Sequence, residues 1–298
     1  MQTNSIYNTL LVLARGIGQV MFQDHVLSGL LMLTGIAIHS WQMALLAIGG
    51  NFISTLTAYL SGYDRDDIRH GLYGFNGTLV GIAAGVFLQL LPTTLLLAAL
   101  AACVSTWITR LFNAQHRLPG FTAPFILATW MLLGICTYYL PDTLIMSDGI
   151  SGLSAETNCF QAFCLGIGQV MFQDHILSGL LFGIGILVHS RTAAFYTALG
   201  ALLPLPLATL YGIDSSIINL GLMGYNGVLC AIALGETNWR SFGWASVSVC
   251  LSVILQIIGM NLHITTLTAP FVLSVWMIQG LKSMDDTGFK KIVKQKGA

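Results

Sequence analysis

GIGQVMFQDHVLSGLL at residues 16–31 returns as GIGQVMFQDHILSGLL at residues 166–181, with one difference, Val26 against Ile176. The two copies start 150 residues apart (16 and 166). An internal match of this length indicates a duplicated unit, and a duplication decides how the rest of the chain is interpreted.

Two further motif pairs follow in the same order. YGFNGTLVGIA begins at Tyr73 and MGYNGVLCAIA at Met223, while FTAPFILATW begins at Phe121 and LTAPFVLSVW at Leu267. Solenoid and propeller repeats have periods of about 20–50 residues, which is far shorter than this spacing. The motifs therefore indicate a protein of two related halves.

The amino-acid composition is typical of a membrane protein. Of its 298 residues, 55% are hydrophobic and 8% are charged, and the mean hydropathy is +0.77, whereas soluble domains are about 25% charged. Inside the hydrocarbon of a bilayer, every backbone polar group must be paired within the protein, so only helices and closed barrels can span it. The long apolar runs favour helices. We predict an all-α polytopic membrane protein. The formal net charge of zero argues against a nucleic-acid partner, which needs a basic surface.

Each half contains about six apolar stretches. In the first half they cover approximately residues 5–22, 26–38, 42–61, 71–91, 93–111 and 120–140. One segment is too polar to face lipid, because it carries Arg15, Gln19, Gln23, Asp24 and His25. Such a segment is tolerated inside the protein or beside a cavity, so we predict a re-entrant pore half-helix there. Five crossings then remain per half, or about ten transmembrane helices.

Basic residues predict the orientation, because Lys and Arg concentrate on cytoplasmic loops and tails. The end of the chain forms a short basic tail with Lys282, Lys290, Lys291, Lys294 and Lys296. The linker 142–161 has no Lys or Arg, so we expect it to face outward with Asp142, Asp148 and Glu156. With an odd number of crossings each, residues 1–150 and 151–298 become inverted membrane repeats. Transporters of that kind place the site near the midplane between the repeats.

The duplicated block pairs an amide with an aromatic ring. Gln19 and Phe22 are three residues apart, as are Gln169 and Phe172, so each pair shares a helix face. In a single copy, a glutamine bonded to the backbone and a phenylalanine in the core would be the simpler interpretation. Two copies in a segment too polar for lipid favour a role in a pathway.

Asp24 and Asp174 end the same block, each followed by a histidine, His25 or His175. They could form a proton relay or a cation site. They could also cap a helix or anchor a turn, and the Ser-Gly that follows shortly after favours this interpretation. His39 and His189 end apolar runs, which favours a role at an interface over catalysis. Arg15 is interpreted as a charged residue at the edge of the membrane.

The other two motif pairs also suit a pore. Asn76 and Asn226 are suited to cap a half-helix, and the glycines around them permit close backbone approach. Two pairs lie at i and i+4 on one helix face, Phe75 with Leu79 and Tyr225 with Leu229. In the TAP motifs, proline frees a carbonyl beside the hydroxyls of Thr122 and Thr268. Helix packing through small residues is the alternative interpretation of these motifs.

No motif indicates an enzyme. The sequence lacks GxSxG, HExxH and Walker A patterns, and its six cysteines form no CxxC pair and no Cys/His spacing that suits zinc. We therefore expect no catalytic residues, no metal site and no cofactor.

The paired GIGQVMFQD–LSGLL, G-aromatic-NG and TAPF blocks resemble those of the bacterial urea transporter family, related to animal urea channels, over essentially the whole chain. The resemblance implies a homotrimer in the bacterial inner membrane, in which each protomer passes urea without ion coupling through a pore between inverted halves. It implies pore roles for Gln19, Gln169, Phe22, Phe75, Leu79, Leu229, Thr122 and Thr268. The second slot is formed by Phe172 and by Tyr225, which stands where the family often has phenylalanine.

The chemistry of urea agrees with this interpretation. Urea is flat and neutral, so it fits an apolar slot while hydrogen-bond acceptors meet its edges. Burying an amide without such partners costs about 1–3 kcal/mol or more. Two alternatives stay open: a proton- or sodium-coupled transporter of a small polar solute that uses Asp24 and Asp174, and a membrane receptor or structural protein without transport.

Overall fold

The structure is a computed structural model that describes residues 2–115, 117–145 and 156–296. It is 78% helical with no strand in those ranges, which confirms the predicted all-α class. Residues 146–155 of the join between the halves, with Asp148, lie outside the described residues. The side chains of the lysines after Ser283 lie outside them too.

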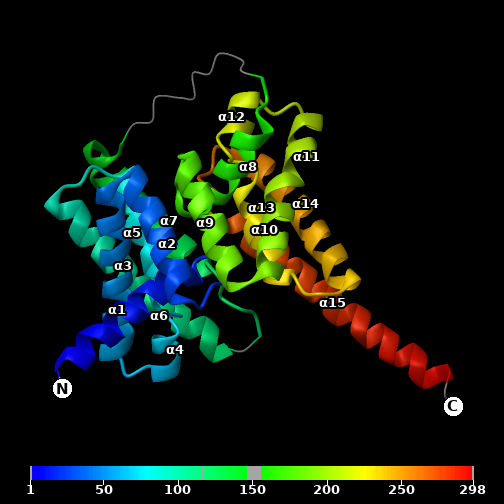
Figure 1. The fold of residues 1–298 in the computed structure, drawn as a ribbon, viewed down its shortest axis with the longest axis horizontal. Coiled ribbons are helices and arrows are strands. Elements are labelled where there is room, and N and C mark those ends of the chain that lie inside the picture. The colour runs from blue at the N-terminus through cyan, green and yellow to red at the C-terminus, as the bar shows by residue number, and fades with distance from the viewer. Residues whose placement is uncertain (1, 116, 146–155, 297–298) are drawn as a thin grey trace.

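The two halves repeat one order of helices (Figure 1). The first half contains α1 (Gln2–Gln19), α2 (Val26–His39), α3 (Trp41–Leu60), α4 (Arg65–Arg69), α5 (Gly74–Phe87), α6 (Pro92–Gln115), α7 (Ala123–Tyr139) and the 3-10 turn η1 (Pro141–Thr143). The second contains α8 (Cys159–Gly168), η2 (Gln169–Met171), α9 (Ile176–His189), α10 (Arg191–Leu202), α11 (Pro204–Leu210), α12 (Ser215–Asn219), α13 (Tyr225–Leu234), α14 (Trp239–Asn261) and α15 (Ala269–Lys296). The split of one long helix into α10 and α11 occurs at Pro204, where a helix interior loses a backbone donor.

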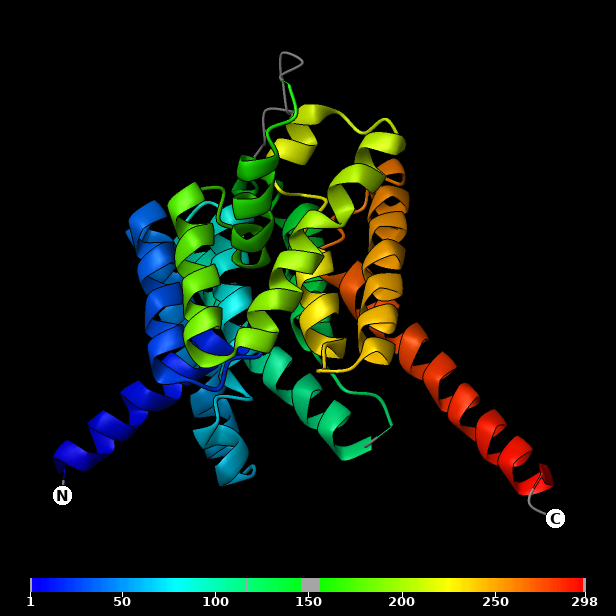
Figure 2. The same ribbon diagram turned by 45° about the vertical axis from the view of Figure 1, so that its right-hand side comes forward.

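The halves meet through reciprocal contacts. Helices α2 and α9 lie side by side (Figures 1 and 2). The Ser28 hydroxyl donates to the Gly185 carbonyl at 2.7 Å, and the Ser178 hydroxyl donates to the Gly35 carbonyl at 2.7 Å. Serine and glycine thus exchange places between the two bonds, which is the pattern of an isologous, two-fold interface.

The most deeply buried elements are the short helices that begin at the two NG motifs. Ten residues of α5 and eight of α13 are buried. At Gly77 a Cβ would overlap the carbonyl oxygen of Gly50 and the Ser54 hydroxyl of α3, and at Gly227 it would overlap the Gly200 carbonyl of α10. Small residues therefore bring these backbones into contact, as the packing interpretation of the motifs requires.

The polar segment around Arg15, Gln19 and Gln23, for which we predicted a re-entrant half-helix, includes the end of a longer helix in the first half. Arg15 and Gln19 form the last turn of an 18-residue helix, α1, and Gln23 follows in a turn. In the second half, the corresponding helix bends by 75° into α9, as a broken span or a re-entrant loop does. The re-entrant half-helix therefore stays a prediction.

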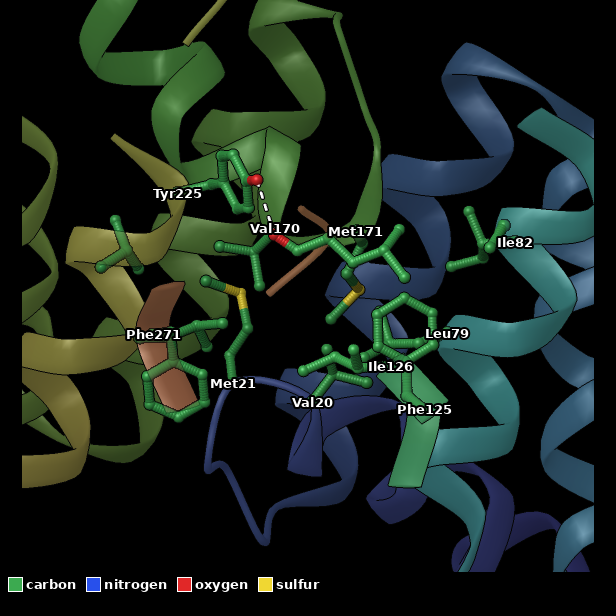
Figure 3. Packing of buried hydrophobic residues seen from close by; sticks show 14 of the residues in the cluster. Val20, Met21, Leu79, Ile82, Phe125, Ile126, Val170, Met171, Tyr225 and Phe271 are labelled. Atoms are coloured by element: carbon green, nitrogen blue, oxygen red, sulfur yellow. Dashed lines mark hydrogen bonds between the residues drawn. The ribbon is translucent and has the colours of Figure 1, made fainter. Parts of the chain in front are cut away.

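Four helices of the described chain are long and apolar enough to cross a membrane, α3, α6, the combined α10 and α11, and α14. The bent pair of α8 and α9 makes a fifth when it is counted as one span. Ten crossings therefore remain a prediction. A single core joins the halves, in which Met21, Leu79 and Phe125 approach Met171 and Phe271 (Figure 3).

Candidate functional site

Two cavities lie at corresponding places in the halves. The first has a volume of about 220 Å³ and is lined by Gln19, Phe22, Phe75 and Thr122 among others. The second has a volume of about 320 Å³ and is lined by Gln169, Phe172, Tyr225 and Thr268 among others. Eight predicted site residues thus fall into two sets of four, related by the internal repeat.

One hydrogen bond connects the two cavities. The hydroxyl oxygens of Thr122 and Thr268 are 2.7 Å apart, and the residues are only 2% and 3% exposed. Each threonine precedes the first residue of its helix, α7 or α15, and Pro124 and Pro270 follow in the first turn. The prolines therefore begin helices, where their missing N–H is harmless, and do not interrupt one as the sequence suggested.

The glutamines present oxygen to the cavities. Gln19 Nε2 donates to the His70 carbonyl at 3.0 Å, and Gln169 Nε2 donates to the Leu220 carbonyl at 3.1 Å. A carbonyl can only accept, so the amide nitrogen must face it and the Oε1 atom must face away. Within the described residues, neither Oε1 atom receives a hydrogen bond, which leaves an acceptor at each cavity.

Each lining ring of the duplicated block packs against an aromatic ring of the opposite half. The Phe22 ring meets Phe271 edge-on with 6.2 Å between centroids, and Phe172 meets Phe125 in the same way at 6.2 Å. A third ring differs between the halves. Phe121 lies 6.0 Å from Phe22, whereas Phe87, which has no aromatic counterpart in the repeat, lies 6.0 Å from Phe172.

Strained backbone is concentrated at these walls. Phe22 and Phe172 have φ angles of 61° and 58°, and Phe121 and Leu267 have φ angles of 46° and 49°. A non-glycine residue at such an angle costs about 1–3 kcal/mol and persists mainly at functional sites. All four residues line a cavity, so the strain marks the same places as the repeat.

The asparagines of the NG motifs have a different role from the one predicted. Asn76 Oδ1 accepts the Phe125 N–H at 3.2 Å, and Asn226 Oδ1 accepts the Phe271 N–H at 3.1 Å. Each asparagine therefore satisfies the first turn of the helix that follows its threonine, not of its own helix. This arrangement leaves the threonine hydroxyls free to meet each other.

Replacing Asn76 with alanine should lower the free energy of unfolding by about 1–3 kcal/mol, because the buried Phe125 N–H loses its acceptor. Thermal unfolding in detergent measures the change. The exposed Asn261, which makes no side-chain hydrogen bond in the described chain, offers the control, and its alanine variant should stay within about 0.5 kcal/mol of the parent. Equal stability of the two variants would contradict the capping role.

The second cavity contains a hydrogen-bonded tyrosine. The Tyr225 hydroxyl donates to the Leu267 carbonyl at 2.7 Å and lies 3.3 Å from Gln256 Oε1. Gln256 also accepts from the Thr266 hydroxyl at 2.8 Å. Phe75 occupies the corresponding place in the first cavity and has no hydroxyl, so the two slots are not equivalent.

Leu79 and Leu229 do not line either cavity. Both are fully buried and belong to the core cluster that also contains Phe125 and Phe271. They stand one helical turn beyond Phe75 and Tyr225, so they pack behind the slot rings rather than beside the open space.

The charged residues of the duplicated block lie outside the cavities. Asp24 contacts Arg15 Nε at 3.6 Å and also pairs with His70, while Arg15 Nη1 donates to the Arg69 carbonyl at 3.1 Å. Neither aspartate caps a helix, because His25 and His175 hold the cap positions. The predicted alternative of a turn anchor agrees with these pairs.

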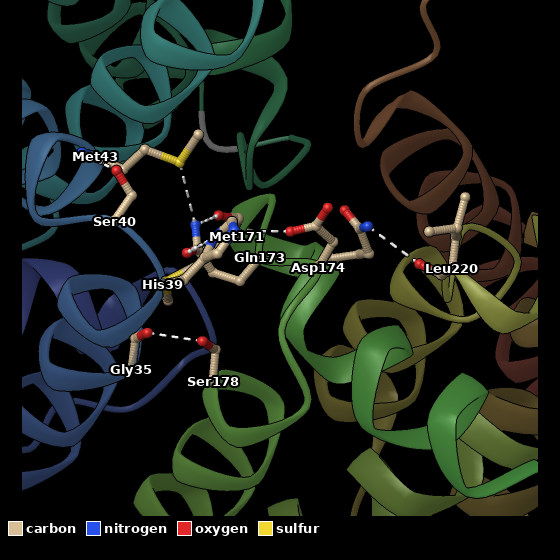
Figure 4. A network of polar contacts seen from close by, with 10 residues as sticks. Gly35, His39, Ser40, Met43, Met171, Gln173, Asp174, Ser178 and Leu220 are labelled. Carbon is tan, nitrogen blue, oxygen red and sulfur yellow. Dashed lines mark hydrogen bonds and ion pairs between the residues drawn. The ribbon is translucent and has the colours of Figure 1, made fainter. Parts of the chain in front are cut away.

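Two histidines lie between the halves. His39 Nδ1 is 3.0 Å from Gln173 Oε1, and His189 Nδ1 is 2.9 Å from Gln23 Oε1. Gln173 Nε2 is already bonded to the Met171 carbonyl, so the histidine must be the donor (Figure 4). The other His39 nitrogen meets Asp174 at 2.9 Å. The two histidines thus lie at the interface between the repeats. The sequence did not indicate this contact between the halves.

Sequence reasoning did not assign several residues in or beside the cavities. Phe125 and Phe271, which contact the lining rings of Phe172 and Phe22 without lining a cavity themselves, stand in the repeated TAPF motif, so the repeat carried a signal for them. Phe87 and Gln256 have no such signal, because other residue types stand in their places in the other half: Thr237 for Phe87, and Thr109, which bonds to Asn76 as Gln256 bonds to Asn226. In the described chain, no Asp, Glu, Lys, Arg or His lines either cavity, and no group of residues suits a metal ion.

Comparison with known proteins agrees with this arrangement. The family model described as "Urea transporter" matches residues 10–283. The chain is 31% identical over 237 residues to urea transporter 1 of Rattus norvegicus and 30% identical over 246 residues to that of Mus musculus. Urea transporter 1 of Capra hircus is 30% identical over 244 residues.

Each of these alignments covers 74% of this chain and 61% of the relative, so the chain spans about 61% of the length of the curated relatives it matches. The family comprises transporters and not enzymes, and the apolar helices agree with a multi-pass membrane protein. The family match extends over most of the sequence, and the chain therefore belongs to the urea transporter family.

Proposed function

We propose that the chain carries urea passively across a membrane, through the two cavities and the Thr122–Thr268 pair between them. The observation that carries this proposal is the pair of repeat-related cavities that adjoin at two buried hydroxyls. Each cavity has an aromatic wall and an unpaired amide oxygen. A flat, neutral diamide matches that combination of shape and acceptors.

The lining also explains how ions would be rejected. An ion must shed its hydration shell to enter a narrow apolar slot, and the cavities offer no charged side chain in compensation. Urea pays a smaller desolvation cost, because the amide oxygens of Gln19 and Gln169 and the threonine hydroxyls accept hydrogen bonds from its N–H groups. Selectivity follows from the slot shape together with this series of acceptors.

The proposal includes a membrane arrangement. The reciprocal contacts between halves support two repeats that run in opposite directions, with five crossings each and α5 and α13 as the short buried elements beside the pore. We propose a homotrimer in a bacterial inner membrane with a cytoplasmic C-terminus, as the family resemblance and the basic tail imply. Four exposed apolar helices provide faces for lipid or for neighbouring protomers.

Stopped-flow urea flux across proteoliposomes tests the function. Urea should equilibrate rapidly, and imposed proton, sodium or potential gradients should not change the rate, because no Asp, Glu, Lys, Arg or His among the described residues lines the cavities. Acetate and glycerol serve as control solutes and should pass no faster than through protein-free liposomes. Accumulation of urea against its gradient would contradict passive transport.

A proton- or sodium-coupled transporter is the alternative. Asp24 and Asp174 would be its coupling groups, but they pair with Arg15, His70 and His39 away from the cavities. We expect the double variant Asp24→Asn, Asp174→Asn to retain gradient-independent urea flux wherever it assembles correctly. A parent protein that concentrates urea and a variant that only equilibrates it would establish coupling.

A further inference from the structure

A cavity of about 560 Å³ lies apart from the two pore cavities. It is formed by the first residues of α10 and α14 and by the connection between α13 and α14. Its lining includes Arg191, Phe195, Glu236, Asn238, Trp239 and Phe242. None of these residues has a part in the proposed pore.

The cavity contains two opposite charges that do not meet. Arg191 makes no ion pair and no side-chain hydrogen bond with any described residue. Glu236 uses Oε2 to accept from Asn238 Nδ2 at 2.9 Å and from the Ser241 hydroxyl at 3.2 Å, while Oε1 has no partner in the described chain. A cation and a carboxylate on one cavity wall, each with unused bonding capacity, are complementary to a ligand that carries both charges.

The remaining wall is aromatic. Trp239 and Phe195 are 87% and 56% exposed, and both rings contact Phe242 with centroids 5.9 and 6.2 Å away. Large exposed rings at the end of a membrane helix are typical of the boundary between headgroups and hydrocarbon. Aromatic faces also attract ammonium groups.

The position of the cavity corresponds to headgroup depth. Two of the helices able to cross a membrane begin there, at Arg191 and at Trp239. Both starts lie at the end of the molecule toward which the basic helix α15 projects (Figures 1 and 2). The repeat places Trp41 where Arg191 stands (191 minus 150), so the first half lacks the charge pair.

We infer that this cavity binds a phospholipid with a zwitterionic, amine-bearing headgroup, such as phosphatidylethanolamine. The Arg191 guanidinium binds the phosphate, for which its paired donors are suited. The primary ammonium donates to Glu236 Oε1 beside the Trp239 ring. The exposed aromatic rings contact the glycerol and the upper acyl chains, and each protein chain holds one such lipid.

Fluorescence quenching by brominated lipid tests this site in liposomes. The Trp239 signal is the difference between the parent and the Trp239→Phe variant. The mole fraction of brominated phosphatidylethanolamine for half-maximal quenching should be about tenfold lower than that of brominated phosphatidylglycerol or phosphatidylcholine, through one charge-assisted hydrogen bond. Equal values for the three lipids would overturn the inference.

Variants assign the preference to the two charges. Arg191→Ala should weaken quenching by all three lipids, and Glu236→Gln should remove only the preference for phosphatidylethanolamine. Arg65→Ala is the matched control, because the exposed Arg65 begins α4 at the same end of the molecule (Figure 1), over Tyr59 and outside the cavity. Its quenching should equal that of the parent.

Two further results would refute a lipid site. One is quenching by all three lipids that stays at the parent's level in Arg191→Ala protein with normal urea flux, since flux reports correct folding. The other is loss of Trp239 quenching when soluble phosphoethanolamine is added, which would identify a water-soluble zwitterion as the ligand.

Discussion

A protein with Thr122→Val and Thr268→Val should pass urea about 5- to 150-fold more slowly than the parent, because an amide group crossing the narrowest segment without a partner costs about 1–3 kcal/mol. The two hydroxyls, 2.7 Å apart, are the buried polar groups between the cavities. Valine has the shape of threonine, so the opening keeps its width. Stopped-flow flux in proteoliposomes measures the effect.

The double change is preferable to either single change. Replacing both partners of a buried hydrogen bond by groups of the same shape is nearly neutral for stability, whereas one replacement leaves an unsatisfied hydroxyl. The single variants should therefore unfold at lower temperature than the double variant. If the double variant assembles normally and retains full flux, the hydroxyls do not contribute to permeation.

Gly77→Ala should destabilise the fold by about 1–3 kcal/mol or more, the usual cost of overpacking a core. The new Cβ would overlap the Gly50 carbonyl oxygen and the Ser54 hydroxyl, so α3 and α5 would have to separate. Since Phe75 lies on α5, urea flux should fall together with stability. Thermal unfolding in detergent, followed by flux assay, measures both.

Gly134 provides the matched control. It lies inside α7, and a Cβ there would have no atom within 4 Å. Gly134→Ala should raise the free energy of unfolding by about 0.5–1 kcal/mol, since alanine favours the helix more than glycine does. Equal effects of the two substitutions would show that helix propensity, and not backbone contact, decides the outcome at Gly77.

Much of this protein can be predicted from its sequence. Hydrocarbon admits few chain conformations, so 55% hydrophobic and 8% charged residues are enough to predict a helical membrane protein. The duplication identified eight residues that line the two cavities, because each half must build its own cavity from the same motif. The repeat could not identify Phe87 and Gln256, because the other half has different residue types in their places.

The partners of the polar groups depended on tertiary structure. Asn76 caps α7 and not its own helix, and His39 bonds to Gln173 of the other half. Hydrogen bonds between residues so distant in sequence leave no periodic pattern along the chain.

By itself, then, the sequence determined the helical class, the duplication and most of the cavity residues, since hydropathy and repetition are properties of the chain alone. Only the tertiary structure decided that Thr122 and Thr268 meet, that Leu79 packs behind the slot, and that Arg191 and Glu236 face one cavity unpaired. Those relations depend on how helices from separate parts of the chain pack, and packing is settled by the shapes of both surfaces together.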